Sequence, residues 1–446
     1  MPTPLALRGA ALLALLAVGS ACQTYDFEPV KPLSVGQTQT SVDIEAVANK
    51  PNFMLLVDKS GSMDQPVDPS NLACKVGGNN GPVCGDPGKV NPCDVSQCPT
   101  RWSELTKALD SYLTQFPLIG RYALSLFPEP ESNAGCGPTT AQRFALPTTS
   151  SDTDATLQAQ ADGTKAKLDE VTSCSPAGPT CTGGGTPTAA SLAFLSSVNE
   201  LVNDDTRDQI VILFTDGLPN CNPALASVAG TVACKCTFGP NLDDCAAGLP
   251  PFSGAGCLDV DNSVTAVQFL ASKGVQTYVV GFGAELTGTV GPSAANARDT
   301  LQRIAVAGSV RFPRVCPGTP PNQPCGADNP CDLATGLCTK QYYQANDASD
   351  LGAILKTITD PNVTVCERFL TEVPSDVSLL SVLVKGTPYP SGPDTWVYVS
   401  PSETTPVSNK PGPAVVFVDG KPLCNQLKTS TGANPVNVQI RILKVL

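Results

Sequence analysis

Three separated segments of the chain carry the oxygen-bearing side chains that a hard divalent cation prefers. Segment 58–62 reads DKSGS and follows an apolar run at 53–57, so an aspartate and two hydroxyl groups alternate there. A threonine follows three glycines at position 186, and a second aspartate stands shortly after the apolar run IVILF, at position 216. Mg2+ takes six oxygen ligands and keeps several waters, and two carboxylates with three hydroxyls suit it without excess negative charge. The predicted metal ligands are Asp58, Ser60, Ser62, Thr186 and Asp216, and the predicted ion is Mg2+, or Mn2+ or Ca2+.

Each of the three segments also has a purely structural explanation. Segment 58–62 could be a solvated turn that follows a strand. Thr186, which precedes Pro187, could cap the N-terminus of a helix. Segment 215–217 could be a turn that ends a strand. Order, spacing and strand context agree in all three segments, so we interpret them together as one metal site.

Composition excludes several classes of function. The chain has no histidine, which excludes Ser-His-Asp and Cys-His catalysis and any histidine-ligated zinc site. Ser60 or Ser62 would need another base to act as a nucleophile, and the side chain of the adjacent Lys59 should point away from its neighbours. We therefore predict no catalytic residue and a protein that is not an enzyme. A net charge of -12 without a basic stripe excludes nucleic acid as a partner.

Apolar runs that alternate with helical patterns position the candidate ligands. Buried strands are expected at 53–57, 122–127, 210–214 and 275–282. Helices are expected at 102–116, 154–171, 186–202, 262–272, 295–307 and 351–358. Continuous apolar strands separated by helices indicate a parallel sheet that is covered on both faces. We expect a doubly wound, mostly parallel α/β domain over 51–360, with its site at the carboxyl ends of the strands.

Cysteine-bearing insertions interrupt this pattern, and a different module follows it. The insertions cover about 64–98, 218–257 and 310–340, and they are too long and too rich in Gly, Pro, Asn and Asp for plain connections. Strand patterns at 377–384, 395–399, 414–418 and 436–443 then predict a small all-β module over 361–446.

The N-terminus predicts export. Residues 1–21 combine a basic start at Arg8, an apolar run at 9–18 and the small residues at 19–21, which is the pattern of a cleaved signal peptide. The apolar run is too short to span a bilayer, for which about 20 residues are needed.

Cys22 is a candidate for lipidation. Cleavage after Ala21 would make Cys22 the first residue, as in a bacterial lipoprotein, and would leave an even number of the 19 cysteines for disulfides. In the alternative, an ordinary signal peptidase cuts there and Cys22 joins a disulfide. Residues 22–50 are expected to be a tether, and Gln23 favours the outer membrane by analogy with such lipoproteins.

Export also predicts that the other cysteines form disulfides. The pairs that we favour are Cys174–Cys181 and Cys366–Cys424. A thiolate zinc site is the disfavoured alternative for Cys325, Cys331 and Cys338. The acidic loops at 259–261 and 328–332 match no calcium-loop pattern, so we interpret them as solvated.

Segments 58–62 (DKSGS), 184–188 (GGTPT) and 215–217 (TDG) resemble the metal-ion-dependent adhesion site of the von Willebrand factor A family. The resemblance covers about 51–360, leaves the insertions unmatched and is closer to bacterial members than to integrin domains. In that family the serines and the threonine usually touch the metal, the aspartates bind it directly or through water, and an acidic side chain of the partner often completes the shell. The positions that match these ligands are Asp58, Ser60, Ser62, Thr186 and Asp216.

The resemblance implies a binding or adhesion protein of the cell envelope, which captures a carboxylate-bearing protein or surface ligand through the metal. We expect an outer-membrane lipoprotein on the periplasmic or surface face, or otherwise a secreted protein. A structural envelope protein, whose metal only stabilises the loops, is the second interpretation, and a metal-dependent hydrolase is the third. Chelation should abolish binding and leave the fold intact in the first case, and should destabilise the fold in the second.

Overall fold

The computed structural model describes the helices and strands of the chain and parts of the insertions between them. The described residues are 39–44, 46–47, 50–85, 92–129, 135–148, 152–171, 182–204, 207–229, 231, 233–237, 256–283, 297–318, 323–326, 328–362, 366–406, 411–428 and 436–445. Among these residues, no helix has both the length and the apolar character needed to cross a membrane. The expected signal peptide, Cys22 and the Cys174–Cys181 pair lie outside the described residues.

Five parallel strands form the central sheet, in the order β4-β3-β5-β6-β9. Their bounds are β3 (Asn52–Asp58), β4 (Arg121–Phe127), β5 (Gln209–Thr215), β6 (Val275–Phe282) and β9 (Tyr343–Ala345). Every residue of the first four strands is buried, as expected for apolar runs covered on both faces. The predicted α/β class and its parallel sheet are confirmed, and the short edge strand β9 is an addition.

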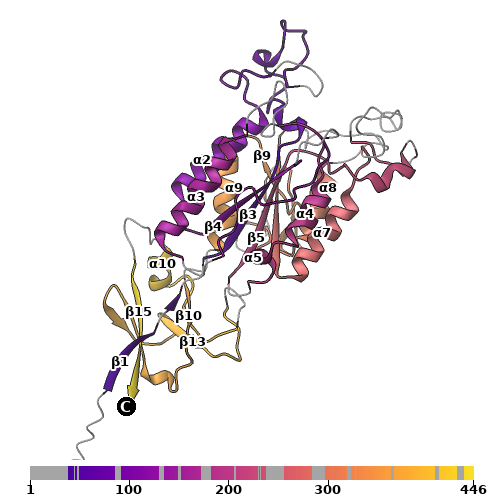
Figure 1. Ribbon diagram of the computed structural model, residues 1–446. Coiled ribbons are helices and arrows are strands. Elements are labelled where there is room, and N and C mark those ends of the chain that lie inside the picture. The colour runs from indigo at the N-terminus through magenta and orange to yellow at the C-terminus, as the bar shows by residue number, and fades with distance from the viewer. Residues whose placement is uncertain are drawn as a thin grey trace, which may run out of the picture.

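Helices cover both faces of this sheet (Figure 1). On one face lie α2 (Arg101–Gln115), α3 (Asp154–Asp169) and α9 (Ala348–Asn362). On the other lie α4 (Thr188–Leu195), α5 (Asn199–Val202), α7 (Val260–Ser272) and α8 (Ala297–Ala307). Strand β3 alternates between the two cores: Leu55 packs in a cluster with Leu105 of α2, and Leu56 packs in a cluster with Leu192 of α4. The helix expected at 186–202 is divided by a turn at 196–197 into α4 and α5.

A separate antiparallel β module packs around its own core. One sheet has the order β1-β15-β11-β12 and the other β13-β14-β10-β2. Their bounds are β1 (Gln39–Ile44), β2 (Ala46–Val47), β10 (Glu367–Leu370), β11 (Leu380–Val384), β12 (Thr387–Tyr389), β13 (Trp396–Val399), β14 (Ala414–Phe417) and β15 (Val438–Val445). The short helix α10 (Pro422–Lys428) contributes Leu423 and Leu427 to the module's core. The module therefore matches the small β region expected at the C-terminus.

Strands β1 and β2 fall within 22–50, the range expected to be a tether. Instead, β1 pairs antiparallel with β15, from Gln39 opposite Val445 to Ile44 opposite Ile440. Strand β2 pairs with β10. The local sequence gives no sign of these pairings, because the partner of β1 lies some 400 positions away and that of β2 some 320. The β module is thus assembled from both sides of the α/β domain.

Disulfides order the cysteine-bearing insertions, as predicted. The pairs among described residues include Cys74–Cys98, Cys84–Cys93, Cys136–Cys221, Cys234–Cys257, Cys316–Cys331, Cys325–Cys338 and Cys366–Cys424. The predicted Cys366–Cys424 pair is confirmed. The three cysteines weighed as zinc ligands, Cys325, Cys331 and Cys338, are each bonded to another cysteine instead.

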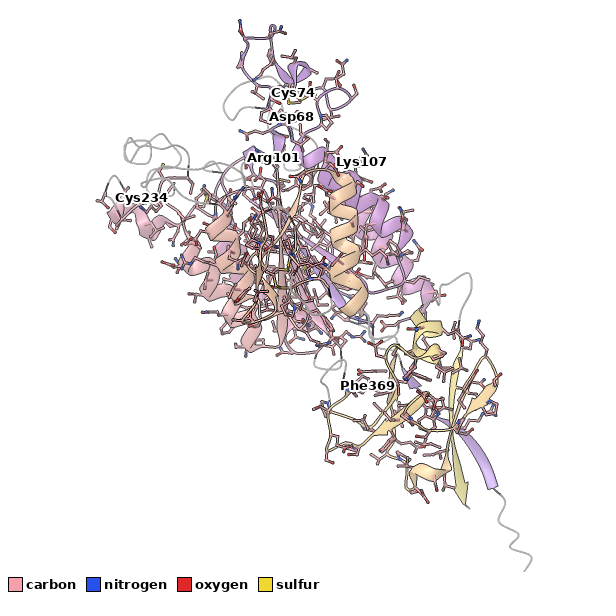
Figure 2. All side chains as sticks on the ribbon, turned by 180° about the vertical axis from the view of Figure 1, so that it is seen from behind. Asp68, Cys74, Arg101, Lys107, Cys234 and Phe369 are labelled. Carbon is pink, nitrogen blue, oxygen red and sulfur yellow. A yellow bond between two sulfur atoms is a disulfide. The ribbon has the colours of Figure 1, made fainter. Side chains whose placement is uncertain are left out.

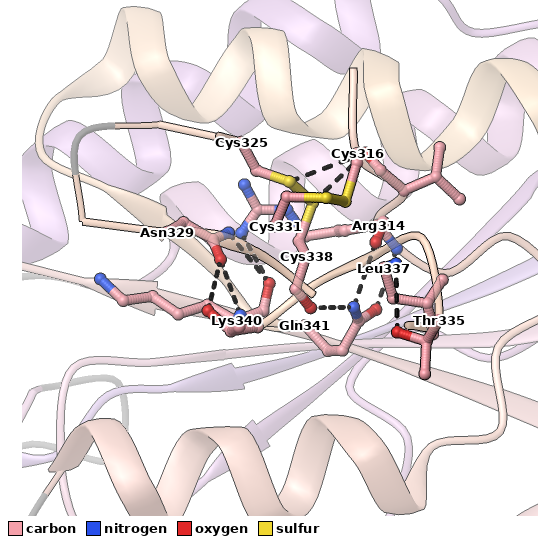
Figure 3. Close-up of a disulfide and its surroundings, with 12 residues drawn as sticks. Arg314, Cys316, Cys325, Asn329, Cys331, Thr335, Leu337, Cys338, Lys340 and Gln341 are labelled. Atoms are coloured by element: carbon pink, nitrogen blue, oxygen red, sulfur yellow. Dashed lines mark hydrogen bonds between the residues drawn. A yellow bond between two sulfur atoms is a disulfide. The ribbon is translucent and has the colours of Figure 1, made fainter. Parts of the chain in front are cut away.

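Figure 3 shows how one insertion is fastened beside the sheet edge. Its two interleaved disulfides lie next to Arg314 and Gln341 (Figure 3). The Gln341 amide donates to the Arg314 carbonyl over 3.1 Å and to the Cys338 carbonyl over 2.6 Å. The Arg314 guanidinium lies 4.8 Å from the ring centre of Tyr343 in β9. The two disulfides and these contacts therefore fix the chain just before it enters the edge strand β9.

Candidate metal centre

Two neighbouring strands bring the two predicted aspartates to one edge of the sheet. Strands β3 and β5 pair in parallel, with Val57 opposite Phe214. Asp58 ends β3, and Asp216 follows the last residue of β5. Both side chains are 0% exposed. The carboxyl edge of a doubly wound sheet is where such folds bind ligands.

The DKSGS loop turns back on Asp58 and reaches Asp216. The Ser60 amide donates to Asp58 Oδ1 over 2.8 Å, and Thr215 Oγ1 donates to Asp58 Oδ2 over 2.6 Å. Ser60 Oγ and Ser62 Oγ lie 3.1 Å apart. Ser62 Oγ in turn donates to Asp216 Oδ1 over 2.8 Å. Four of the five predicted ligands therefore belong to one hydrogen-bonded group.

The glycine-rich loop that precedes Thr186 lies against the DKSGS loop. The Gly183 amide donates to the Lys59 carbonyl over 2.7 Å, and the Gly61 amide donates to the Gly184 carbonyl over 3.1 Å. The two loops are thus joined through their backbones. The Thr186 side chain is 5% exposed. The structure brings its loop to the site, and its contact with a metal stays a prediction.

Comparisons with known proteins give only distant similarities. No family model and no curated protein matches the chain. A manganese-loaded TRAP protein of Plasmodium vivax is 16% identical, over 72% of this chain and 78% of that one, with a TM-score of 0.33. The pilus adhesin RrgA of Streptococcus pneumoniae is 11% identical, over 91% and 58% of the two chains, with a TM-score of 0.35. The SpRpn10 VWA domain is 8% identical, over 59% and 84%, with a TM-score of 0.28.

TM-scores this low support no conclusion about the fold of this chain. The fold is assigned from its own strand order and from the geometry of its site. Parallel strands in the order β4-β3-β5-β6-β9 place the segments 58–62, 184–188 and 215–217 at one sheet edge, as the sequence resemblance requires. The α/β domain is von Willebrand factor A-like.

A disulfide and an asparagine support the Thr186 loop of this A-like domain, and the sequence pattern missed both. Asn220 Oδ1 accepts from the Thr186 backbone N–H over 2.7 Å, and the Asn220 backbone N–H donates to the Thr186 carbonyl over 2.9 Å. The Cys136–Cys221 disulfide packs directly behind this loop, because a Cβ at Gly185 would lie 2.5 Å from Cys221 Sγ. Cys221 lies shortly after segment 215–217, but its partner Cys136 is 85 positions away, and such a spacing has no local signature.

Arg101 is the second feature that the sequence pattern missed. It is the first residue of α2. Figure 2 shows it at the end of the A-like domain that is farther from the β module, where Phe369 is labelled. Arg101 Nη1 donates to Asp216 Oδ2 over 2.7 Å and to the Ser62 carbonyl over 3.4 Å. The two paired side chains are 2% and 0% exposed. A buried cation therefore contacts one of the predicted metal ligands.

The electrostatics of Asp58 reflect the burial of two carboxylates at one point. Burial, followed by the nearby charge of Asp216, raises the pKa of Asp58 to about 7. Hydrogen bonds from Thr215 and Ser60 lower this pKa only in part. An unneutralised buried carboxylate is costly, so this pair favours a bound cation.

The donor set therefore fits a hard divalent metal. Carboxylate and hydroxyl oxygens are the ligands of Mg2+ and Mn2+, and the described ligand atoms offer no sulfur or nitrogen that would select a softer ion. The residues that would hold the metal are Asp58, Ser60, Ser62, Thr186 and Asp216.

Proposed function

We propose that this protein is an exported binding protein, which captures a carboxylate-bearing protein or surface ligand through a divalent metal at the A-like domain. The observation that carries the proposal is the Ser62–Asp216 contact, since it joins two segments far apart in sequence into one oxygen-lined site. The proposal is one of binding, without turnover.

The chemistry of the side chains suits reversible capture. Asp58 and Asp216 supply the negative charge, while Ser60 and Ser62 supply neutral oxygen atoms. Hydroxyl groups are weak ligands, so a bound divalent ion would stay electrophilic toward an incoming carboxylate. The site lies at the carboxyl edge of the sheet, where the loops that carry segments 58–62, 184–188 and 215–217 meet.

The arrangement of the two modules supports attachment at the cell envelope. Figure 1 shows β1, the first described strand, in the β module, at the opposite end of the molecule from the top of the parallel sheet. A lipid on Cys22 would then leave the sheet edge that carries Asp58 and Asp216 pointing away from the bilayer. The disulfides of the insertions agree with an oxidising compartment.

A capture experiment tests this function. Purified mature protein is immobilised and incubated with solubilised envelope extract in Mg2+ or in chelator, with the Asp58→Ala variant in parallel. We expect ligand to bind only to the wild-type protein in Mg2+. The matched control is Asp208→Ala, because Asp208 lies at the opposite end of β5 from Asp216 and pairs with Arg311.

The outcomes separate the proposal from its alternatives. Capture that persists in chelator and in Asp58→Ala would reject a metal-bridged ligand. Loss of the fold on chelation, measured by circular dichroism, would favour a metal that only stabilises the loops. Turnover of an extract component would favour the hydrolase.

A further inference from the structure

The ion pair between Arg101 and Asp216 places a resident cation inside the candidate metal site. Its two charged groups are 2.7 Å apart, and both side chains are buried. The same guanidinium approaches the backbone of Ser62, whose hydroxyl contacts the other oxygen of the Asp216 carboxylate. Arg101 therefore contacts the metal-binding loop as well as its carboxylate.

The position of Arg101 is unfavourable for the helix that carries it. A cation at the first residue of a helix opposes the positive end of the helix dipole. Helix α2 already begins with a capping box made by Thr100 and Ser103, so it does not need Arg101 to start. The helix thus gives no reason for an arginine here, whereas the site offers its guanidinium two acceptors.

The end of β6 leaves room for the guanidinium. Gly283 has a φ of +108°, and a Cβ there would lie 2.8 Å from Arg101 Nε. A side chain at this position would collide with the arginine. Gly283, the residue that follows β6, is therefore packed against the Arg101 side chain.

The charge of the loaded site follows from these contacts. The two aspartates would balance a divalent ion, and Arg101 adds a positive charge that they do not balance. Lys59 and Asp64 also lie in this region and carry opposite charges, which offset each other to first order. A metal-loaded site with a net positive charge attracts an anion and opposes the metal itself.

We infer that Arg101 is a built-in counter-cation, which keeps the affinity for metal alone low and makes a carboxylate ligand necessary for tight, joint binding of metal and ligand. This inference rests on the metal site of the proposed function and adds its regulation. Metal and anionic ligand then strengthen each other's binding, as reciprocal linkage requires.

Calorimetric titration with Mn2+ tests the inference on the wild type and three variants. In Arg101→Gln we expect Mn2+ to bind about tenfold or more tightly, because a unit charge beside a ligand carboxylate repels a divalent ion strongly at an effective dielectric constant of about 20. Arg101→Lys keeps the charge and should bind Mn2+ as the wild type does. Arg121→Gln is the matched control, since Arg121 is a buried, aspartate-paired arginine at the opposite end of the sheet, and it should leave the affinity unchanged.

The ligand half of the inference is tested with acetate at constant ionic strength. Acetate should tighten Mn2+ binding to the wild type and should do so less in Arg101→Gln. Thermal unfolding gives a readout that does not depend on binding assays. In chelator Arg101→Gln should unfold at a lower temperature than the wild type, because Asp216 loses its ion pair, and saturating Mn2+ should narrow that gap.

Several results would overturn the inference while the metal site stands. These are unchanged or weaker Mn2+ binding in Arg101→Gln, equal effects of Arg101→Gln and Arg101→Lys, or an equal acetate effect in wild type and Arg101→Gln. Binding by Arg101→Gln but not by the wild type would support it. Binding of Mn2+ by neither protein would reject the proposed metal site and this inference together.

Discussion

At the scale of single residues, the main feature of the candidate site is that it buries two carboxylates close together. Asp58 and Asp216 are withdrawn from water at the same sheet edge, and three kinds of donor lie around them: hydroxyl groups, the Ser60 backbone amide and a guanidinium. Hydroxyl groups donate to both carboxylates, and the Arg101 guanidinium contacts Asp216. A raised pKa of Asp58 is the remaining sign of incomplete compensation.

This raised pKa predicts that metal binding depends on pH. Since the pKa of Asp58 is about 7, protons compete with the metal below that pH. We expect Mn2+ affinity to fall by about tenfold per pH unit below about pH 7 and to level off above it. Titrations between pH 5.5 and 8.5 measure the dependence. A flat profile over this range would contradict the shift.

The raised pKa of Asp58 also predicts how the stability of the metal-free protein changes with pH. The folded pKa of about 7 lies above the ordinary aspartate pKa of 3.8, so the contribution of Asp58 is fully present below about pH 4 and is lost as the pH rises through about 7. Asp58→Asn should remove this loss and should therefore unfold at a higher temperature than the wild type in chelator at pH 8. A lower unfolding temperature for Asp58→Asn at pH 8 would argue against a costly ionised Asp58.

At the scale of elements, the site depends on the packing of the glycine-rich loop. Gly184 has a φ of +82°, and a Cβ there would lie 2.3 Å from the Gly135 carbonyl oxygen. The Cys136–Cys221 disulfide holds the same region from behind. The loop is therefore built for close backbone contact, which leaves Thr186 little freedom.

Gly184→Ala should disturb this loop. We expect a loss of about 1–3 kcal/mol in the free energy of unfolding from backbone strain, together with weaker Mn2+ binding. Gly352→Ala is the control, because it lies in α9 with open space around it and should stabilise the protein by about 0.5–1 kcal/mol. Denaturant titration measures both. Equal effects of the two substitutions would show that the loop is not tightly packed.

Removing the Cys136–Cys221 disulfide should act on stability and on the site together. Cys136→Ser combined with Cys221→Ser should lower the free energy of unfolding by about 2–4 kcal/mol. It should also weaken Mn2+ binding, since the disulfide packs against the loop that carries Thr186. Removal of the Cys325–Cys338 pair should leave Mn2+ affinity unchanged. Wild-type affinity in the first double variant would show that the disulfide has no part in positioning the loop.

At the scale of the whole molecule, the α/β domain is inserted into the β module. The chain enters the module through β1 and β2, passes through the parallel sheet and returns at β10. The chain therefore crosses twice between the two modules, and Arg101, which contacts the candidate site, lies at the end of the α/β domain away from the β module (Figure 2).

Deletion of residues 39–47 should unfold the β module selectively. Strand β15 would lose its pairing with β1, and β10 would lose its pairing with β2. Limited proteolysis with mass spectrometry should then show cuts after about residue 366, while Mn2+ binding persists. A deletion of equal length within 23–38 is the control. Intact, protease-resistant β module after loss of 39–47 would contradict a structural role for β1 and β2.

Anchoring is also a property of the whole molecule. If Cys22 is lipidated, two or more acyl chains should hold the protein at the membrane, because one chain binds only marginally. We expect Cys22→Ser to move the protein from the detergent fraction into the soluble fraction, and the wild-type N-terminal peptide to show a mass increase. An unmodified Cys22, or a disulfide through it, would end the lipoprotein interpretation and leave a secreted binding protein.

The sequence by itself determined the features that follow from local patterns. Apolar runs predicted β3, β4, β5 and β6 to within a residue or two at each end, because complete burial on two faces forces continuous hydrophobic segments. The same reasoning placed Asp58 and Asp216 at a common edge, since parallel strands end on the same side. The structure brings these side chains into one hydrogen-bonded group, and metal binding by them stays a prediction.

Only the tertiary structure decided which distant residues support that group. Arg101 and Asp216 are 115 positions apart, Cys136 and Cys221 are 85 apart, and neither spacing has a local signature. Strand β1 likewise gained its partner from the other end of the chain. Contacts of this kind are fixed by how the helices, loops and sheets pack, so a period of two or 3.6 residues carries no information about them.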